Sequence, residues 1–345
     1  MRFFESNKRS KGTFDSTDTL KGIAIIAVLL NHYLNLNVGG DSQGFANLLI
    51  GIFFMVSGYS IAYSLQKLFA QRPQKVTRNI FTFYSQRIIR IFPLFWVAYI
   101  VQSTVHNVDI SLLTLLGVRA PGHFWFIPAI LQCYLVAPLV YVLIHKNRVL
   151  TFVGLILGFV LLNYILLSDV APPTLIYLCK YVHGHWRGLF FLYILLFALS
   201  LFIPVFESCR DDIGTKEKTL YYLTLFASLV GCMIIVKYRS HVPVLYEISV
   251  STIYPLLLLL VSSQYAISMG VRIPIISFIG AISYPLYLFH ILFFREVVTL
   301  FPAQNYPVLG HLIVLVLLPL LVTSCVLINK VNNHATSYLR QRISG

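Results

Sequence analysis

Hydrophobic residues fall in long runs along this chain, and polar residues gather in the short segments between the runs. The runs are about twenty residues long, the length that a helix needs to cross the hydrocarbon core of a bilayer. They are too long for barrel strands and lack the polar–apolar alternation of such strands. The pattern predicts an all-α polytopic membrane protein with about ten transmembrane helices, at residues 20–37, 45–66, 80–103, 123–144, 149–167, 188–206, 219–237, 244–266, 273–298 and 307–329.

Only short segments connect these runs, and the largest are residues 67–79, 168–187 and 207–218. We therefore expect a single membrane domain over residues 1–345, with no separate soluble domain. The composition agrees, because 58% of the residues are hydrophobic and 11% are charged. This balance excludes an ordinary soluble protein of the same size.

Positive charge is concentrated in alternate connecting segments. The formal net charge is +14, and twenty of the 26 Lys and Arg residues fall on one side of the membrane if the first helix enters from the cytoplasm. Because basic residues favour the cytoplasmic side, this bias predicts that both termini are cytoplasmic. Orientation and contact with membrane lipids explain the basic excess, so we expect no nucleic-acid partner.

The first run carries two ionisable residues, Lys21 and His32, in the stretch Asp18-Thr-Leu-Lys-Gly-Ile-Ala-Ile-Ile-Ala-Val-Leu-Leu-Asn-His. At about 100° per residue both side chains fall on one helix face, with a rise of roughly 16 Å between them. Such residues are costly to bury in a membrane and favour a functional role. The alternatives are that Lys21 extends to the lipid headgroups and that His32 packs between helices.

The second and third runs each carry a polar pair. Ser57-Gly58 permits close helix packing, and the Ser hydroxyl can also bond across helices. Arg87 and Arg90 lie on one helix face near the predicted cytoplasmic boundary, where two guanidinium groups could bind phosphate. The alternative role for this arginine pair is to anchor the helix at the cytoplasmic surface.

Polar and aromatic residues also recur in the fourth and ninth runs. In the ninth run three of them are spaced i, i+4 and i+7, which places them on one stripe of a helix. Helix packing is the alternative role for the stripe in the ninth run, and for Trp125 the alternative is a place in the aromatic belt at the outer interface. The residues are His123, Trp125, Gln132 and Tyr134 in the fourth run, and Ser283, Tyr287 and His290 in the ninth.

No metal site is expected from the ligand-type residues. The five cysteines are scattered, without the spacing of a disulfide framework or a metal site. His183 and His185 form an H-x-H pair in an outer loop, but acidic residues are scarce around them.

Taken in order, these motifs resemble those of the acyltransferase-3 family, integral-membrane enzymes that O-acetylate glycans and related acceptors. The family's opening motif is a basic residue followed, after ten other residues, by His, in a setting like D-x-L-R-G-I-A. Lys21 and His32 match this motif. The resemblance covers about residues 15–330. The other matches are F-F-x-x-S-G at 53–58, R-x-x-R-I-x-P at 87–93, H-x-W-F-L and Q-F-Y-L within 123–135, and S-Y-x-L-Y-L-x-H at 283–290.

The resemblance implies transfer of an acyl group, expected to be acetyl, from cytoplasmic acyl-CoA to a hydroxyl of a cell-surface or lipid-linked glycan. The membrane would be the inner (plasma) membrane of a bacterium, and acetyl-CoA would be a donor substrate, with no cofactor bound permanently. His32 would be the catalytic general base or a transient acyl carrier, and Lys21, Arg87 and Arg90 would hold the phosphates of CoA. Supporting or substrate-binding roles would fall to Ser57, His123, Trp125, Gln132, Tyr134, Ser283, Tyr287 and His290.

The chain departs from the family pattern at several positions. Lys21 stands where Arg is commonest, and Gly51, Ile130 and Leu131 stand where many members carry acidic residues. No carboxylate is therefore in an evident position to orient His32. A transporter or flippase of a glycan or lipid-linked precursor is the alternative function, since buried polar residues and proline-interrupted helices suit it too. A relative that lacks activity and has a structural or regulatory role is the third hypothesis.

Overall fold

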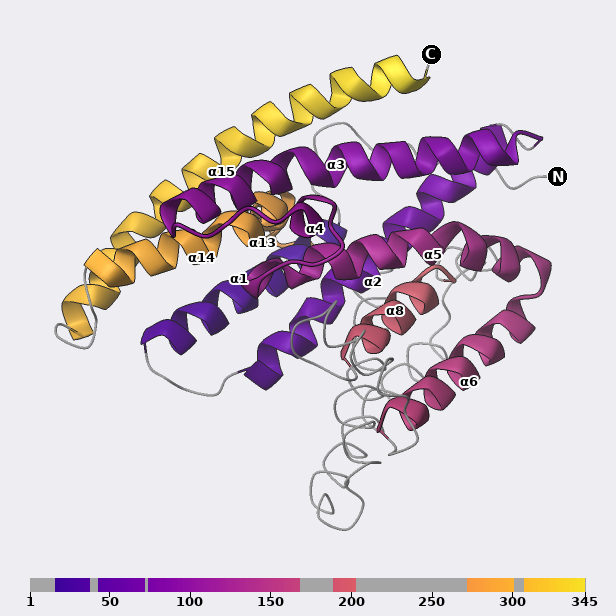
Figure 1. Cartoon of the computed structure of the whole chain (residues 1–345), viewed down its shortest axis with the longest axis horizontal. Coiled ribbons are helices and arrows are strands. Elements are labelled where there is room, and N and C mark those ends of the chain that lie inside the picture. Colours follow the sequence, from indigo (N-terminus) through magenta and orange to yellow (C-terminus); the bar gives the residue numbers. More distant parts are fainter. Residues whose placement is uncertain are drawn as a thin grey trace, which may run out of the picture.

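The computed structural model describes residues 16–37, 43–71, 74–167, 189–202, 272–300 and 307–344, and these residues are almost entirely helical, without a strand among them. The prediction of an all-α protein is confirmed for this part of the chain. The elements, shown in Figure 1, are α1 (Ser16–Asn37), α2 (Gln43–Gln71), α3 (Val76–Val105), α4 (Leu112–Leu115), the 3-10 helix η1 (Gly122–Trp125), α5 (Phe126–Lys146), α6 (Arg148–Leu167), α8 (Leu189–Ser200), α13 (Pro274–Ala281), α14 (Ser283–Leu300) and α15 (Pro307–Ser344).

Helices occupy every expected span that falls within the described residues. Three segments, Val76–Val105, Gly122–Lys146 and His311–Leu339, are long and apolar enough to cross a membrane, and a bent helix pair would add a fourth. The expected spans at 219–237 and 244–266 lie outside the described residues. The total of ten spans and the cytoplasmic position of both termini therefore stay predictions.

The ninth expected span is broken into two helices. α13 and α14 meet at Ile282 with a bend of 77°. Pro285 explains the break, because in a continuous helix its ring would clash with the carbonyl of Ala281 and it has no N–H to donate. Interrupted helices within a membrane are tolerated where they are covered by protein or line a cavity.

α1 crosses α13 with backbone against backbone. A Cβ atom on Gly22 would overlap the backbone of α13, and one on Gly280 would overlap the backbone of α1. The buried hydroxyl oxygens of Thr19 and Ser277 share a hydrogen bond of 2.6 Å across the same contact. Small residues allow this close approach in membrane helices. The crossing places Lys21, the neighbour of Gly22, beside the break between α13 and α14.

α2 packs equally closely on α8. A Cβ atom on Gly58 would overlap the side chain of Ser200 and the backbone of Phe197. The close packing predicted for the Ser57-Gly58 pair is therefore confirmed at the glycine. Nearby, the ring of Phe54 stacks on Tyr193 of α8 with the ring centroids 4.5 Å apart.

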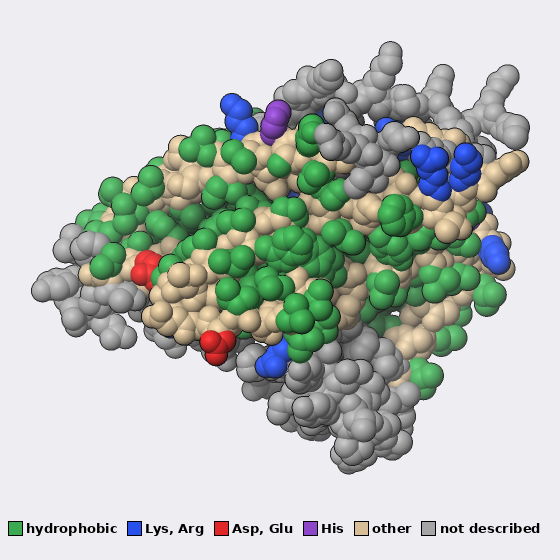
Figure 2. Space-filling view, turned by 45° about the horizontal axis from the view of Figure 1, so that its top comes forward, with side chains coloured by type: hydrophobic (Ala, Val, Ile, Leu, Met, Phe, Trp, Pro, Cys, Tyr) green, Lys and Arg blue, Asp and Glu red, His purple; other side chains and the backbone are tan. Residues whose placement is uncertain are grey.

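Large apolar side chains remain on the outside of the molecule. Figure 2 shows them spread over the middle of one face. Leu135 and Leu139 of α5 are 66% and 62% exposed, and Val316 of α15 is 74% exposed. An apolar surface of this extent is expected of a protein surrounded by lipid, whose hydrocarbon tails replace water around these side chains.

The close contact between α1 and α13 predicts that one methyl group added at Gly280 destabilises the protein. Gly280→Ala should lower the free energy of unfolding by about 1–3 kcal/mol, because neither backbone can move away without repacking the helices. Thermal denaturation of the detergent-solubilised protein would show this as a lower melting temperature. Gly154→Ala in α6 is the matched control, since a Cβ atom there meets nothing within 4 Å. Equal melting temperatures for the two variants would contradict the close contact.

Candidate active site

A pocket lies between α1, α2, α3, the η1–α5 segment and the start of α14. Its empty volume is about 1040 Å³, including the open mouth. Of the twelve site residues expected from the sequence, Gln132 and His290 do not line this pocket. The other ten do: Lys21, His32, Ser57, Arg87, Arg90, His123, Trp125, Tyr134, Ser283 and Tyr287.

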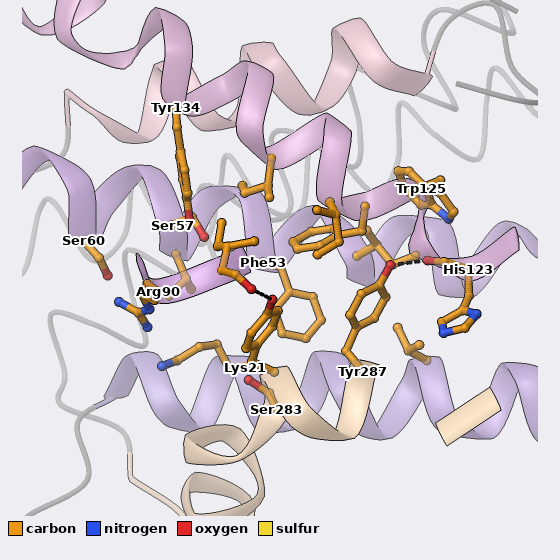
Figure 3. A pocket seen from close by; sticks show the side chains of 18 of the residues that line it. Lys21, Phe53, Ser57, Ser60, Arg90, His123, Trp125, Tyr134, Ser283 and Tyr287 are labelled. Carbon is orange, nitrogen blue, oxygen red and sulfur yellow. Dashed lines mark hydrogen bonds between the residues drawn. The ribbon is translucent and has the colours of Figure 1, made fainter. Parts of the chain in front are cut away.

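One end of the pocket is cationic. Figure 3 shows Lys21 and Arg90 near one another at this end, with Ser57 and Ser60 close by. Arg90 is exposed, so the pocket reaches the surface here. The ammonium nitrogen of Lys21 lies 2.5 Å from a carboxylate oxygen of Asp18, one turn earlier on α1. Part of the charge of Lys21 is therefore balanced within its own helix.

Arg87 is held more tightly than Arg90. Its side chain is only 8% exposed, and its Nη2 donates a hydrogen bond of 2.9 Å to the hydroxyl of Ser64 on α2. The guanidinium also lies over the rings of Phe83 and Tyr134, 5.4 Å and 5.8 Å from their centroids. Cation–π contacts of this kind fix the plane of a guanidinium. Arg87 is thus a positioned group in the wall, whereas Arg90 lies at the mouth.

A stripe of serines on α2 faces this cationic end, and only one member was expected. Ser57 and Ser60 line the pocket, and Ser64 holds Arg87. Their spacing of i, i+3 and i+7 is a helical repeat, so the signal is present in the sequence. Ser57 stands out in the sequence because it adjoins Gly58, whereas Ser60 and Ser64 have no such neighbour.

The middle of the pocket is apolar. Phe53 lines it together with Val56, Phe126, Ile127 and Ile130. The sequence indicated no role for these residues beyond packing. Figure 3 shows the ring of Phe53 between the two ends of the pocket. An apolar passage therefore connects the cationic end to the far end.

Tyr284 is a further pocket residue that was not expected. Its hydroxyl donates a hydrogen bond of 2.7 Å to the carbonyl oxygen of Ile91 on α3. This bond ties the first turn of α14 to the helix that carries both arginines. Ser283, its neighbour, is 7% exposed and lines the pocket at the helix break.

Histidine side chains lie at the far end. His32 of α1 and His123 of η1 both line the pocket there. The Tyr287 hydroxyl donates a hydrogen bond to the backbone carbonyl of His123, as Figure 3 shows, and so holds η1 against α14. His290, one turn along α14, is fully buried behind this end, and its ring centroid is 5.0 Å from that of His32.

The arrangement suits a long ligand with an anionic head. Lys21 and His32 are roughly 16 Å apart along α1, so one ligand could reach both ends. Cations can hold the anionic head, and a neutral imidazole can exchange a proton at the other end. Among the described residues, no group of three or more His, Cys, Asp or Glu side chains is arranged to hold a metal ion.

Comparison with protein families gives one match for nearly the whole chain. A family model described as an acyltransferase domain matches residues 14–330. These residues include every side chain of the pocket. Searches of curated proteins and of solved structures find no match.

The pocket can be tested without reference to function. In a chain whose five native cysteines are replaced, Ser57→Cys should react with a small methanethiosulfonate reagent, because this position faces the open pocket. Ile61→Cys, one turn along α2, should stay unmodified, since Ile61 is 1% exposed in the core. Intact-protein mass spectrometry would measure both adducts. Equal labelling of the two positions would contradict the pocket.

Proposed function

The chain belongs to the acyltransferase-3 family of integral-membrane acyltransferases, and from this premise we propose that it transfers an acetyl group from cytoplasmic acetyl-CoA to a hydroxyl of a cell-surface or lipid-linked glycan. The setting we propose is the inner membrane of a bacterium. One observation carries the proposal: a single pocket joins a cationic mouth to His32.

The cationic end suits the donor. CoA carries phosphate groups at one end and its thioester at the other, joined by a slender arm. Arg90 at the mouth and Arg87 in the wall offer guanidinium groups, which bind phosphate oxygens in pairs. Lys21 adds an ammonium group, although its ion pair with Asp18 weakens its pull on a phosphate. The apolar passage past Phe53 then accommodates the arm.

His32 provides the acid–base chemistry in this proposal. The neutral imidazole takes the proton of the acceptor hydroxyl as that oxygen attacks the thioester carbonyl carbon. A carbon–oxygen bond forms and the carbon–sulfur bond breaks. The CoA thiolate leaves with the electron pair and receives the proton from His32. The products are the glycan ester and free CoA thiol, and His32 returns to its neutral form.

The glycan enters from the histidine end. Trp125 lies beside His123 at this end, and an indole offers a flat apolar face to a sugar ring. With the predicted orientation, this end lies toward the outer side of the membrane and the cationic mouth toward the cytoplasm. The donor and the acceptor would then meet at His32 from opposite sides.

If His32 is the general base, its replacement should abolish acyl transfer without lowering the amount of protein. His32→Ala should lower acceptor-dependent release of thiol from acetyl-CoA by at least about a hundredfold, because the hydroxyl then loses its general base. The assay uses purified protein with candidate glycan acceptors and a thiol-reactive dye. Leu34→Ala, on the exposed side of α1, is the control and should keep full activity. Full activity of His32→Ala would rule out its catalytic role, and glycan movement without thiol release would indicate a transporter.

The donor site predicts a different effect at Arg90. Arg90→Gln should raise the KM for acetyl-CoA about tenfold and leave kcat nearly unchanged, because it removes a charge-assisted bond to phosphate. Arg78→Gln, at an exposed position on the same helix, should match the parent protein. Acetyl-pantetheine, which lacks the phosphates, should be used equally well by all three proteins. A KM effect that persists with acetyl-pantetheine would argue against phosphate binding by Arg90.

A further inference from the structure

His290 is a buried polar residue that has no direct access to the pocket. It is fully buried on α14 and does not line the pocket. Its ring lies against two other imidazoles, with centroids 5.0 Å from His32 and 5.3 Å from His123. A polar group in such a place is costly unless its bonding capacity is used.

The backbone determines which nitrogen of His290 carries the proton. Its Nδ1 lies 2.7 Å from the carbonyl oxygen of Tyr287 and 3.1 Å from that of Leu286. Carbonyl oxygens only accept hydrogen bonds, so in the neutral ring Nδ1 must be the protonated nitrogen. Nε2 is then an acceptor with a free lone pair. In the described part of the chain this buried Nε2 has no hydrogen-bond partner.

Two neighbouring imidazoles could supply a donor to this lone pair. The Nε2 atom of His123 lies 3.4 Å from the carbonyl oxygen of Leu288, which takes its N–H in the neutral form. His123 then has no second N–H to give. Among the described residues the ring of His32 has no such backbone bond, and it lines the open pocket. Its N–H is therefore the one available to His290.

We propose that Nε2 of His290 is the acceptor that orients His32 for catalysis. At a ring-centroid separation of 5.0 Å, nitrogens that face each other can come within hydrogen-bond distance. The bond closes when the ring of His32 turns toward His290, as catalytic hydrogen bonds tighten once substrate is bound. His290 is thus a positioning residue, and the inference rests on the proposed function of His32.

This contact would do the work of an orienting carboxylate, for which the sequence offers no evident candidate near His32. A backbone carbonyl holds the Nδ1–H of His290, its Nε2 accepts the N–H of His32, and the other nitrogen of His32 faces the pocket as the base. The chain of bonds selects one tautomer of His32 and one ring orientation. Because the acceptor is neutral, it also leaves no extra charge buried between the helices.

Three substitutions of His290 separate positioning from packing. Gln places an acceptor oxygen near the Nε2 position, whereas Asn reaches only the Nδ1 position and Phe keeps the ring without nitrogens. His290→Asn and His290→Phe should lower kcat for thiol release about ten- to a hundredfold, with the KM for acetyl-CoA unchanged, because misplacement of the base costs rate and not donor affinity. His290→Gln should recover most of that kcat.

The outcomes distinguish failure of the proposed acyltransferase function from failure of the positioning role of His290. A parent protein that releases no thiol with any acceptor contradicts the proposed function itself. A parent protein that is active, with a Phe variant of unchanged kcat, overturns the positioning role alone. Loss of kcat in the Gln variant equal to that in the Asn variant also overturns it, provided that both elute as monodisperse protein. If the Asn variant fails to fold, the comparison of Gln with Phe gives the same decision.

Discussion

The contact between α1 and α13 is the constraint on which the site depends. Two glycines, Gly22 and Gly280, let the backbones touch where any side chain would separate them. The hydrogen bond between Thr19 and Ser277 holds the same contact. Because α14 begins directly after α13, this crossing sets where the broken helix turns past α1. Lys21 then faces the break, and His32, three turns along α1, faces His290.

The break at Pro285 gives the two parts of this segment different tasks. α13 packs closely against α1, and α14, which changes direction at the break, also contacts α1 and provides pocket residues at its start, where Tyr284 bonds to the backbone of α3. Further along α14, Tyr287 holds η1 and His290 lies behind His32. The bend of 77° between α13 and α14 lets the two helices contact α1 in different directions. The interruption is thus part of how the site is built.

Helical spacing was enough to anticipate much of the site. Lys21 and His32 are eleven residues apart, which places them on one face of α1, and both line the pocket. Arg87 and Arg90, three residues apart on α3, line it as well. The serine stripe of α2 follows the same rule but was recognised only at Ser57. Contacts between distant helices could not be read in this way. The pairing of His32 with His290, and of Ser64 with Arg87, depends on how helices cross, which no local pattern reports.

Two further differences between the sequence-based expectation and the structure, at Gln132 and in the ninth span, have local causes. Gln132 does not line the pocket, because Ile130 and Tyr134, one helical turn apart, face it, and Gln132, halfway between them, points the other way. The break in the ninth span has a signal in Pro285, but a proline near a helix end is compatible with either a kink or a stop. The side of the membrane that each end faces is predicted from the bias of Lys and Arg between the connecting segments.

In the proposed reaction one pocket carries the donor from the cationic mouth to His32. Cryo-electron microscopy of the protein with a non-hydrolysable acetyl-CoA analogue would show whether it does. We expect density for phosphates at Arg90 and for the acetyl carbonyl beside His32, with the connecting arm passing Phe53. An analogue bound elsewhere, or bound with its acetyl group away from His32, would overturn the proposed donor path.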